Sequence, residues 1–405
     1  MSRPAILMTA STLPRWAGDT EPEFILQLAN ALADRYRVTV LAPHYPGAER
    51  DEEIGGVTIH RYRYAPESWQ SLAYSGGMLH RLREKPLRWL LVPGFLLGQL
   101  LAILRLQRKA RFDLIHAHWI VPQGLVVAAL KTLGLYRGPF ILSSHGGDLF
   151  SLLGRFFLPF KRWILKRADR VNVVSEAMIA PAIELGAPAE RVVVRSMGID
   201  TVSRFTCAQA LDERKGIVFV GRLVEKKGVE VLLRAFAEIG TRHPDQTLRI
   251  IGDGPLRAEL EQLARDLGCT NICFIGAIPN QDVPAELNHA SIAVVPSVVA
   301  SDGDQEGLGL VAVEAMACGC AVVVSALPAL NDVVTDGETG MMVEPGDHEA
   351  LSQAIESLLV DDARRTQLGE AGRDTARARF DWRAVSEDFS QLYEDALNQK
   401  GLGDR

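Results

Sequence analysis

Residues 304–319 read DQEGLGLVAVEAMACG, and this stretch decides how the second half of the chain is interpreted. The glycine-rich residues 306–309 run into an apolar segment in which Leu310 and Val313 have helical spacing. The first turn of a helix offers unpaired N–H groups and the positive end of the helix dipole. The pattern therefore predicts a helix N-terminus suited to an anion such as a diphosphate.

Two carboxylates flank this predicted anion site. If the helix begins near Leu308, Glu306 lies at its mouth and Glu314 on its shaft, on roughly one face, because eight residues make just over two turns. Carboxylates do not suit the phosphates themselves, but they suit the hydroxyls of two sugars, one on each side. The alternative is an ordinary buried helix with two surface glutamates.

Strand and helix patterns alternate along the whole chain, which predicts an α/β fold with parallel sheets and crossover helices. The pattern ends near Asp200 and restarts at residue 216, so we expect two doubly wound, Rossmann-like domains. The expected strands are residues 6–9, 37–41, 57–61, 112–116, 140–144, 168–174, 191–195, 216–221, 248–252, 272–275, 292–296, 321–325 and the end of 337–343.

Two cations follow the first strand of the second domain. Arg222 and Lys227 lie in the loop after residues 216–221. A diphosphate leaving group gains negative charge as its bond breaks, and fixed cations stabilise that charge most in the transition state. Arg binds phosphate bidentately and Lys acts as a point charge. The alternative is an exposed basic turn.

Histidines follow two strands of the first domain. His145 comes after residues 140–144 and before two glycines, at the carboxyl end of a parallel strand, where open α/β sheets bind ligands. His116 ends the preceding strand and His118 follows it, and these two are the second candidates. A His-x-His pair also suits a metal, but no third ligand lies nearby in the sequence. Asp148 is a candidate to orient an acceptor or take its proton.

These motifs resemble, in order over nearly the whole chain, the retaining glycosyltransferases of family 4 (group 1), which have the GT-B fold. The Glu306–Glu314 spacing is similar to the family's Glu-x7-Glu signature. The resemblance implies two Rossmann-like domains facing each other across a cleft. It implies an acceptor-binding domain at 1–200, a nucleotide-sugar-binding domain at 201–379, and a helix at 380–405 that returns to the first domain.

The resemblance also implies roles for individual residues. His145 hydrogen-bonds the transferred sugar or orients the acceptor, Glu306 holds hexose hydroxyls, and Glu314 lies near the ribose. The family's first loop carries a glycine pair, but Asp19-Thr20 stands in that place here, so Gly18 is the remaining candidate. The implied catalytic residues are His145 and Glu306; the donor-binding residues are Gly18, Arg222, Lys227, Gly307, Leu308, Gly309, Leu310 and Glu314; the acceptor-side residues are Asp148 and His118.

Two mechanisms fit retention of configuration. Glu306 is a candidate nucleophile for a double displacement. The resemblance favours attack on the face that the leaving group vacates, with a phosphate oxygen taking the acceptor proton. Asp302-x-Asp304 has the spelling of a metal motif but lies in the loop before the signature. We expect no metal and no cofactor; a nucleotide-diphosphate sugar is the co-substrate.

Residues 86–106 are the most apolar stretch of the chain. We expect two helices broken at Pro93-Gly94, with Trp89 and Phe95 placed to meet lipid or a lipid-linked acceptor. The alternatives are core helices with a solvated basic rim and a transmembrane helix. Cations flank the stretch at both ends, and residues 1–200 hold 25 Lys and Arg against 17 Asp and Glu, whereas the remainder holds 19 against 33. This asymmetry favours an anionic membrane surface as a partner of the first half; no nucleic-acid partner is expected.

The function predicted is transfer of a hexose from a nucleotide-diphosphate sugar to a glycan or lipid-linked acceptor, in cell-surface polysaccharide or glycolipid synthesis. No signal-peptide pattern opens the sequence, and an odd number of scattered cysteines fits a reducing compartment. We therefore expect a cytoplasmic, peripheral enzyme at the inner leaflet. The alternatives are another enzyme of this fold, such as a phosphorylase or sugar-nucleotide epimerase, and a non-catalytic nucleotide-sugar-binding, membrane-docking protein.

Overall fold

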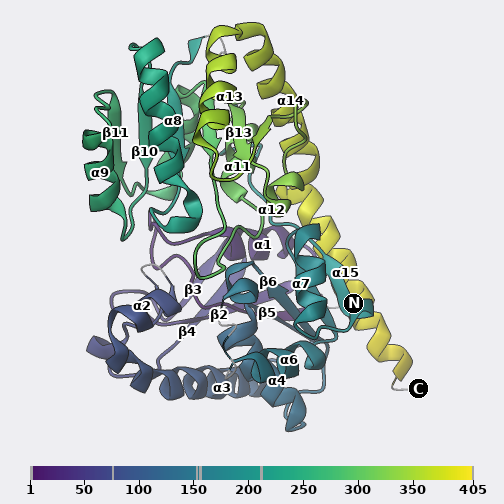
Figure 1. Ribbon diagram of the computed structural model, residues 1–405. Helices are drawn as coiled ribbons and strands as arrows, with labels where there is room; N and C mark the ends of the chain where they lie inside the picture. Colours follow the sequence, from purple (N-terminus) through teal and green to yellow (C-terminus); the bar gives the residue numbers. More distant parts are fainter. Residues whose placement is uncertain (1–2, 75–76, 152–153, 155–156, 210–212, 404–405) are drawn as a thin grey trace. The chain divides into compact units, whose positions relative to one another are not determined.

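The computed structural model describes residues 3–403 except 75–76, 152–153, 155–156 and 210–212, and the chain forms two compact units (Figure 1). Unit 1 contains residues 1–174, 178–196 and 385–405. Unit 2 contains residues 175–177 and 197–384. The first unit is therefore assembled from both ends of the sequence.

Unit 1 is built on an eight-stranded sheet with the order β3-β4-β2-β1-β5-β6-β7-β8. All neighbours are parallel except β3, which runs antiparallel to β4. The chain winds outward from β1 in both directions, so the topological switch point lies between β1 and β5. The strands are β1 (Ala5–Thr9), β2 (Arg37–Pro43), β3 (Asp51–Ile54), β4 (Val57–Tyr62), β5 (Leu114–His118), β6 (Phe140–Ser144), β7 (Arg170–Val173) and β8 (Val192–Val194).

Helices cover both faces of this sheet. Helices α3 (Val92–Lys109), α4 (Leu125–Thr132) and α6 (Leu158–Arg167) lie together on one face (Figure 1). The remaining helical segments of unit 1 include α1 (Phe24–Leu32), α2 (Met78–Glu84), η2 (Pro86–Leu91), η3 (Ile120–Gly124), α5 (Gly147–Phe150) and α7 (Ile179–Glu184).

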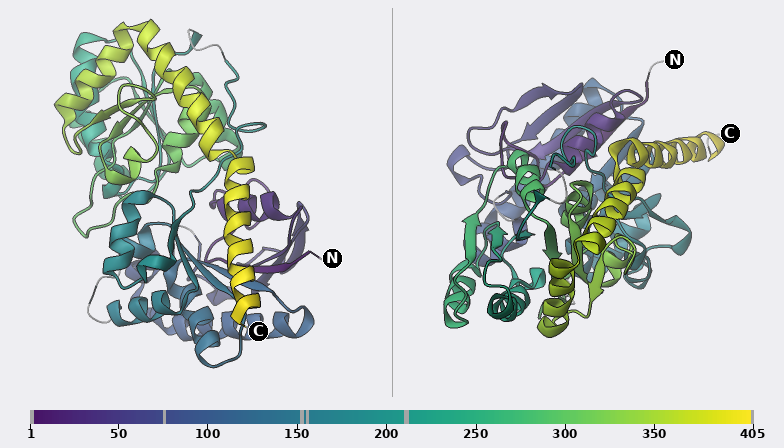
Figure 2. Two further views of the ribbon diagram at one scale, coloured as in Figure 1. Left: turned by 90° about the vertical axis from the view of Figure 1, so that its right-hand side faces the viewer. Right: turned by 90° about the horizontal axis from the view of Figure 1, so that it is seen from above.

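The last helix, α15 (Trp382–Gly403), belongs to unit 1 from Val385 onward and runs beside it in Figure 2. Its Tyr393 hydroxyl lies 2.7 Å from Nδ1 of His116 on β5, and Phe389 packs on the same imidazole. The helix buries one stripe with helical spacing. Its members are Val385, Phe389, Leu392, Tyr393 and Ala396.

Unit 2 is built on a six-stranded parallel sheet with the order β11-β10-β9-β12-β13-β14. This is the doubly wound order, with its switch point between β9 and β12. The four inner strands, β10, β9, β12 and β13, are short, largely buried and rich in β-branched residues, as expected for a sheet covered on both faces, whereas the edge strands β11 and β14 are only partly buried. They are β9 (Ile217–Val220), β10 (Leu248–Ile251), β11 (Ile272–Gly276), β12 (Ile292–Val295), β13 (Ala321–Ser325) and β14 (Met341–Val343).

Crossover helices bury apolar stripes against this sheet. In α8 (Val229–Arg242) the residues Leu232, Phe236 and Ile239 are buried at helical spacing. The other helices of unit 2 are α9 (Arg257–Asp266), α10 (Val283–His289), α11 (Leu310–Ala317), α12 (Pro328–Asn331), α13 (His348–Val360) and α14 (Asp362–Phe380).

Three local predictions need correction. Strand β5 lies two residues later than predicted, so His118 ends the strand itself. Helix α11 begins at Leu310 rather than near Leu308, because Gly309 takes a left-handed conformation (φ 81°) that an α-helix does not continue through.

The predicted break at Pro93-Gly94 is also displaced. The chain changes from η2 to α3 between Leu91 and Val92, and α3 continues through both residues. Pro93 lies in the first turn, where its missing N–H group has no helical partner to lose.

Candidate functional site

The predicted donor residues of unit 2 gather at the switch point of its sheet. The loop after β9 carries Arg222 and Lys227, and the loop after β12 leads to Glu306. These strands are neighbours, so their carboxyl ends lie side by side and the two loops meet. Lys227 and Glu306, which are 79 positions apart in the sequence, thus lie together.

An ion pair joins the two loops. Nζ of Lys227 lies 2.6 Å from Oε1 of Glu306, and the Ser297 hydroxyl donates to the same oxygen at 3.3 Å. The side chains are only 17% and 9% exposed. Burial alone would raise the pKa of Glu306, but the Lys227 ammonium outweighs it, and the pKa lies below its usual value. Glu306 is therefore an ionised, oriented acceptor at neutral pH.

A second ion pair holds the same loop from outside. Nζ of Lys226 lies 3.1 Å from Oδ1 of Asp304, and Oδ1 of Asp302 accepts from the backbone N–H of Asp304. The Asp302-x-Asp304 pair thus folds the loop. Across the described residues, no group of three or more His, Cys, Asp or Glu side chains is arranged to hold a metal ion.

The signature segment then enters α11. Gly307 and Leu308 lie in the loop, Gly309 is the N-cap, and Leu310 is the first helical residue. Glu314 is half-buried on the second turn. The single-face argument made from the sequence does not hold, because Glu306 lies in the loop and not on the helix. Loop folding, and not helical periodicity, sets its position.

In unit 1, three imidazoles lie in a row at the carboxyl ends of β5 and β6. The rings of His118 and His145 stack at a centroid distance of 5.3 Å, and Nδ1 of His118 lies 3.1 Å from Nε2 of His145. His116 stacks behind His118 at 4.1 Å. Burial lowers the pKa of His116 and of His145 to about 3 and that of His118 well below its usual value. All three rings are neutral at pH 7.

The neutral His145 ring can form hydrogen bonds but carries no charge at pH 7. Its ring packs against Phe24 and Trp119 at centroid distances of 5.0 and 5.1 Å. Within the described part of the chain, Nδ1 of His145 and Nε2 of His118 have no hydrogen-bond partner. His118 is fully buried, so it is placed to orient His145.

The Asp148 carboxylate accepts hydrogen bonds from neighbouring residues of unit 1. Oδ2 accepts from the Ile120 N–H at 2.7 Å, and Oδ1 accepts from the Ser144 hydroxyl at 2.8 Å and the His145 N–H at 3.1 Å. Burial raises the pKa of Asp148, against these hydrogen bonds. Through these hydrogen bonds, Asp148 holds the backbone of His145 in position.

Lys161 was not among the residues predicted from the sequence. Its ammonium is buried and donates to the carbonyls of Leu149 (3.0 Å) and Ser151 (2.7 Å), just after the His145 loop. Burial lowers the pKa of Lys161 to about 8. Nothing in the sequence separates Lys161 from the exposed Arg162 beside it, so only packing identifies it.

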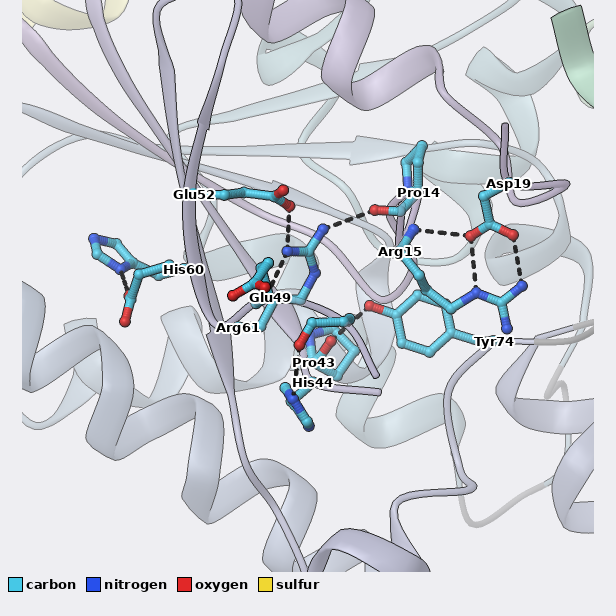
Figure 3. A network of polar contacts seen from close by, with 12 residues as sticks. Pro14, Arg15, Asp19, Pro43, His44, Glu49, Glu52, His60, Arg61 and Tyr74 are labelled. Atoms are coloured by element: carbon cyan, nitrogen blue, oxygen red, sulfur yellow. Dashed lines mark hydrogen bonds and ion pairs between the residues drawn. The ribbon is translucent and has the colours of Figure 1, made fainter. Parts of the chain in front are cut away.

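The loop after β1, where Gly18 lies, is anchored by a polar network (Figure 3). Arg15 makes a two-pronged ion pair with Asp19, at 2.8 and 2.6 Å. Arg61 donates to the Pro14 carbonyl at 2.7 Å. The Asp19 side chain is thereby turned into the protein. Gly18 is exposed with φ 76°, so its backbone is accessible, as are its neighbours Trp16 and Ala17.

Each of the two units thus carries polar side chains at the carboxyl ends of its parallel strands, where doubly wound folds bind ligands. The family model "Glycosyl transferases group 1" matches residues 208–375, and "Glycosyltransferase Family 4" matches residues 23–203. The chain belongs to this family of glycosyltransferases, and its fold is GT-B. The predicted family, fold and enzyme class are confirmed.

Relatives by sequence carry related names. The chain is 32% identical over 267 residues to the GDP-mannose-dependent alpha-(1-6)-phosphatidylinositol monomannoside mannosyltransferase of Mycolicibacterium smegmatis, covering 62% of this chain and 69% of that protein. It is 39% identical over 325 residues to the D-inositol 3-phosphate glycosyltransferase of Corynebacterium kroppenstedtii, covering 72% and 69%.

Solved structures share the fold along nearly the whole chain. Sucrose-phosphate synthase from Thermosynechococcus elongatus aligns with a TM-score of 0.78 at 25% identity, covering 98% of this chain and all of that one. The Anabaena protein HepE, solved with UDP-glucose, aligns with a TM-score of 0.73 at 19% identity, covering 96% and 99%. The chain is thus a nucleotide-sugar glycosyltransferase.

Proposed function

We propose that this glycosyltransferase transfers a hexose, with retention of configuration, from a nucleotide-diphosphate sugar to a lipid-linked or glycan acceptor at the cytoplasmic side of a membrane. The observation that carries the donor part is the pairing of Lys227 with Glu306 beside Arg222 at the switch point of unit 2. The relative from Mycolicibacterium is named for GDP-mannose and a phosphatidylinositol mannoside. This name supports a lipid-linked acceptor and puts GDP-mannose first among donors to test.

In this proposal, the donor diphosphate lies against Arg222, Lys227 and the N–H groups at the start of α11. The diphosphate competes with Glu306 for the Lys227 ammonium, and the freed carboxylate accepts hydrogen bonds from hexose hydroxyls. Glu314 binds the ribose, and Gly18 offers backbone to the phosphates. His145, neutral and held by His118, binds the sugar or the acceptor.

The proposed chemistry is attack on the face that the leaving group vacates. The bond from the anomeric carbon to the phosphate oxygen breaks, the acceptor oxygen bonds to that carbon, and its proton passes to the departing phosphate. Arg222 and Lys227 supply the positive charge for the leaving group, so we propose that transfer is independent of metal. Glu306 as a nucleophile is the competing route, and the Lys227 pair makes Glu306 a weaker nucleophile.

A thermal-shift experiment tests the donor site. GDP, UDP and ADP and their sugars are added at about 100 times Kd, with Mg²⁺ or EDTA; binding at this level stabilises by about 2.7 kcal/mol. One nucleotide is expected to raise Tm equally with Mg²⁺ and with EDTA. The shift should be lost in Lys227→Met and Glu314→Gln and kept in Arg234→Met, a control on the outer part of α8. No shift with any nucleotide would leave a non-catalytic protein as the better proposal.

A double variant separates folding from binding. Lys227→Met leaves Glu306 buried without its cation, which is expected to cost about 3 kcal/mol of unfolding free energy. Adding Glu306→Gln removes the charge and should restore most of that stability without restoring the nucleotide shift. Recovery of the shift in the double variant would contradict the proposed role of Lys227.

A further inference from the structure

Helix α3 has a face that packs on the unit 1 sheet. Phe95, Gln99 and Ile103, spaced four residues apart, are fully buried. A Cβ added at Gly94 would lie 2.5 Å from the Tyr64 carbonyl oxygen, and one at Gly98 would lie 2.8 Å from that of Arg63. The helix is therefore held against backbone along one side. Phe95 packs on Tyr62 and Tyr64, so the expectation that it meets lipid is wrong.

The opposite face of α3 exposes large apolar side chains. Leu97 and Leu101 are 54% and 41% exposed, and they lie two residues away from the buried positions, which on a helix is the other side. The preceding turn, η2, continues the surface with Leu87 (81%) and Leu90 (79%). Trp89 is 47% exposed beside them. Contiguous exposed leucines of this kind mark an interaction surface.

Cations continue the same helix face. Arg105 and Arg108 follow Leu101 at helical spacing and are exposed, and Lys109 and Arg111 come next. Residues 85–112 contain no Asp or Glu. Exposed apolar side chains beside a row of cations complement an anionic lipid leaflet, which has apolar acyl chains beneath negatively charged headgroups.

The segment Pro86–Lys109 has 24 residues and is long and apolar enough to cross a membrane: an 18-residue window within it has a mean hydropathy of 1.8 and is 22% buried. A spanning helix meets lipid all round, but α3 is fixed to the sheet along its buried face. The packing therefore favours a helix lying in the interface over one that spans it.

We propose that the lipid face, defined as Leu87, Leu90, Leu97, Leu101, Arg105 and Arg108, docks unit 1 on an anionic membrane surface. The leucines enter the boundary between headgroups and acyl chains, and the cations bind the headgroups. Docking requires neither donor nor transfer, so its test is separate from that of the proposed activity.

The test is co-flotation of the full chain with vesicles of phosphatidylcholine alone or with added phosphatidylglycerol. Binding is expected only to the anionic vesicles and should fall as salt rises. Leu97→Asp and Leu101→Asp should each weaken partition about tenfold, because burial of a leucine is lost. Arg105→Glu and Arg108→Glu should each weaken it at least about fivefold.

Matched controls come from unit 2. Val360→Asp changes another exposed apolar residue and Arg265→Glu another exposed cation, and both should bind vesicles like the unchanged protein. Circular dichroism and the nucleotide thermal shift check that every variant is folded. Equal binding to neutral and anionic vesicles, or no binding, would overturn the proposal. So would a dimer in sedimentation velocity that Leu97→Asp dissociates, since a second copy would then cover this face.

Discussion

At the residue scale, Gly228 fixes the distance between the two loops of the donor site. It follows Lys227 with φ 64°, and a Cβ there would lie 1.8 Å from the carbonyl oxygen of Pro296, just after β12. The loop after β9 can meet the loop leading to Glu306 only because this position has no side chain. The Lys227–Glu306 contact therefore depends on Gly228, which has no side chain to take part in binding or catalysis.

Gly228→Ala is expected to cost about 3 kcal/mol of unfolding free energy, combining left-handed strain with a backbone clash. Gly268→Ala is the matched control: its φ is 70°, but no atom lies within 4 Å of the added Cβ. It should cost only about 1 kcal/mol. Urea unfolding of both variants measures the difference, and equal costs would show that the contact with Pro296 is unimportant.

At the element scale, strands β5 and β6 carry a polar row inside the protein. His116 bridges the Tyr393 hydroxyl and the Ser143 hydroxyl, both at 2.7 Å, and Asn172 on β7 donates to Ser143 at 3.0 Å. The stack of His116, His118 and His145 ends this network at the carboxyl edge of the sheet. Buried hydrogen-bonded rows of this kind hold a side chain in one orientation.

This row predicts an acid-sensitive fold. Burial holds the pKa of His116 and His145 at about 3, below the usual value of about 6.5. Between these values the unfolded chain binds more protons, so the stability contribution is complete above pH 6.5 and is lost as the pH falls toward 3. The urea midpoint should fall from pH 7 to pH 5.

His116→Asn should flatten that fall, since one titrating group is removed. An unchanged slope in His116→Asn would show that the buried imidazoles do not control the acid response.

At the scale of the whole molecule, unit 1 takes part of its core from the C-terminal helix α15. Phe389 and Tyr393 of α15 are fully buried and contact His116, and the hydroxyl of Tyr36 donates to the Ser390 carbonyl at 3.2 Å. The C-terminal helix therefore completes the core of a unit whose strands all come from the N-terminal half of the chain.

Phe389→Ala is expected to destabilise unit 1 by about 3–5 kcal/mol, because a buried ring is replaced by a cavity. The control is Gln391→Ala on the exposed side of α15, which should change stability by less than about 0.5 kcal/mol. Urea unfolding followed by circular dichroism measures both. A loss below about 1 kcal/mol for Phe389→Ala would mean that α15 adds little to the core.

Much of the fold was predictable because its signals are local. Alternation of apolar strands and helices predicted the two parallel sheets, and strands 140–144 and 321–325 were placed to the residue. The antiparallel edge strand β3 was missed, because its residues are acidic and exposed and carry no burial pattern. Gly309 displaced the start of α11 through a backbone angle that the pattern does not encode.

The sequence alone determined the α/β class, because strand and helix periodicity is local, and the family, through the resemblance of its motifs. The tertiary structure alone decided that Lys227 pairs with Glu306, that Asp148 is used internally, and that Phe95 faces the core while Leu97 does not. The physical reason is that pairing and burial depend on residues distant in the chain. Local pattern predicts which side chains are present at an edge, and packing decides what each of them contacts.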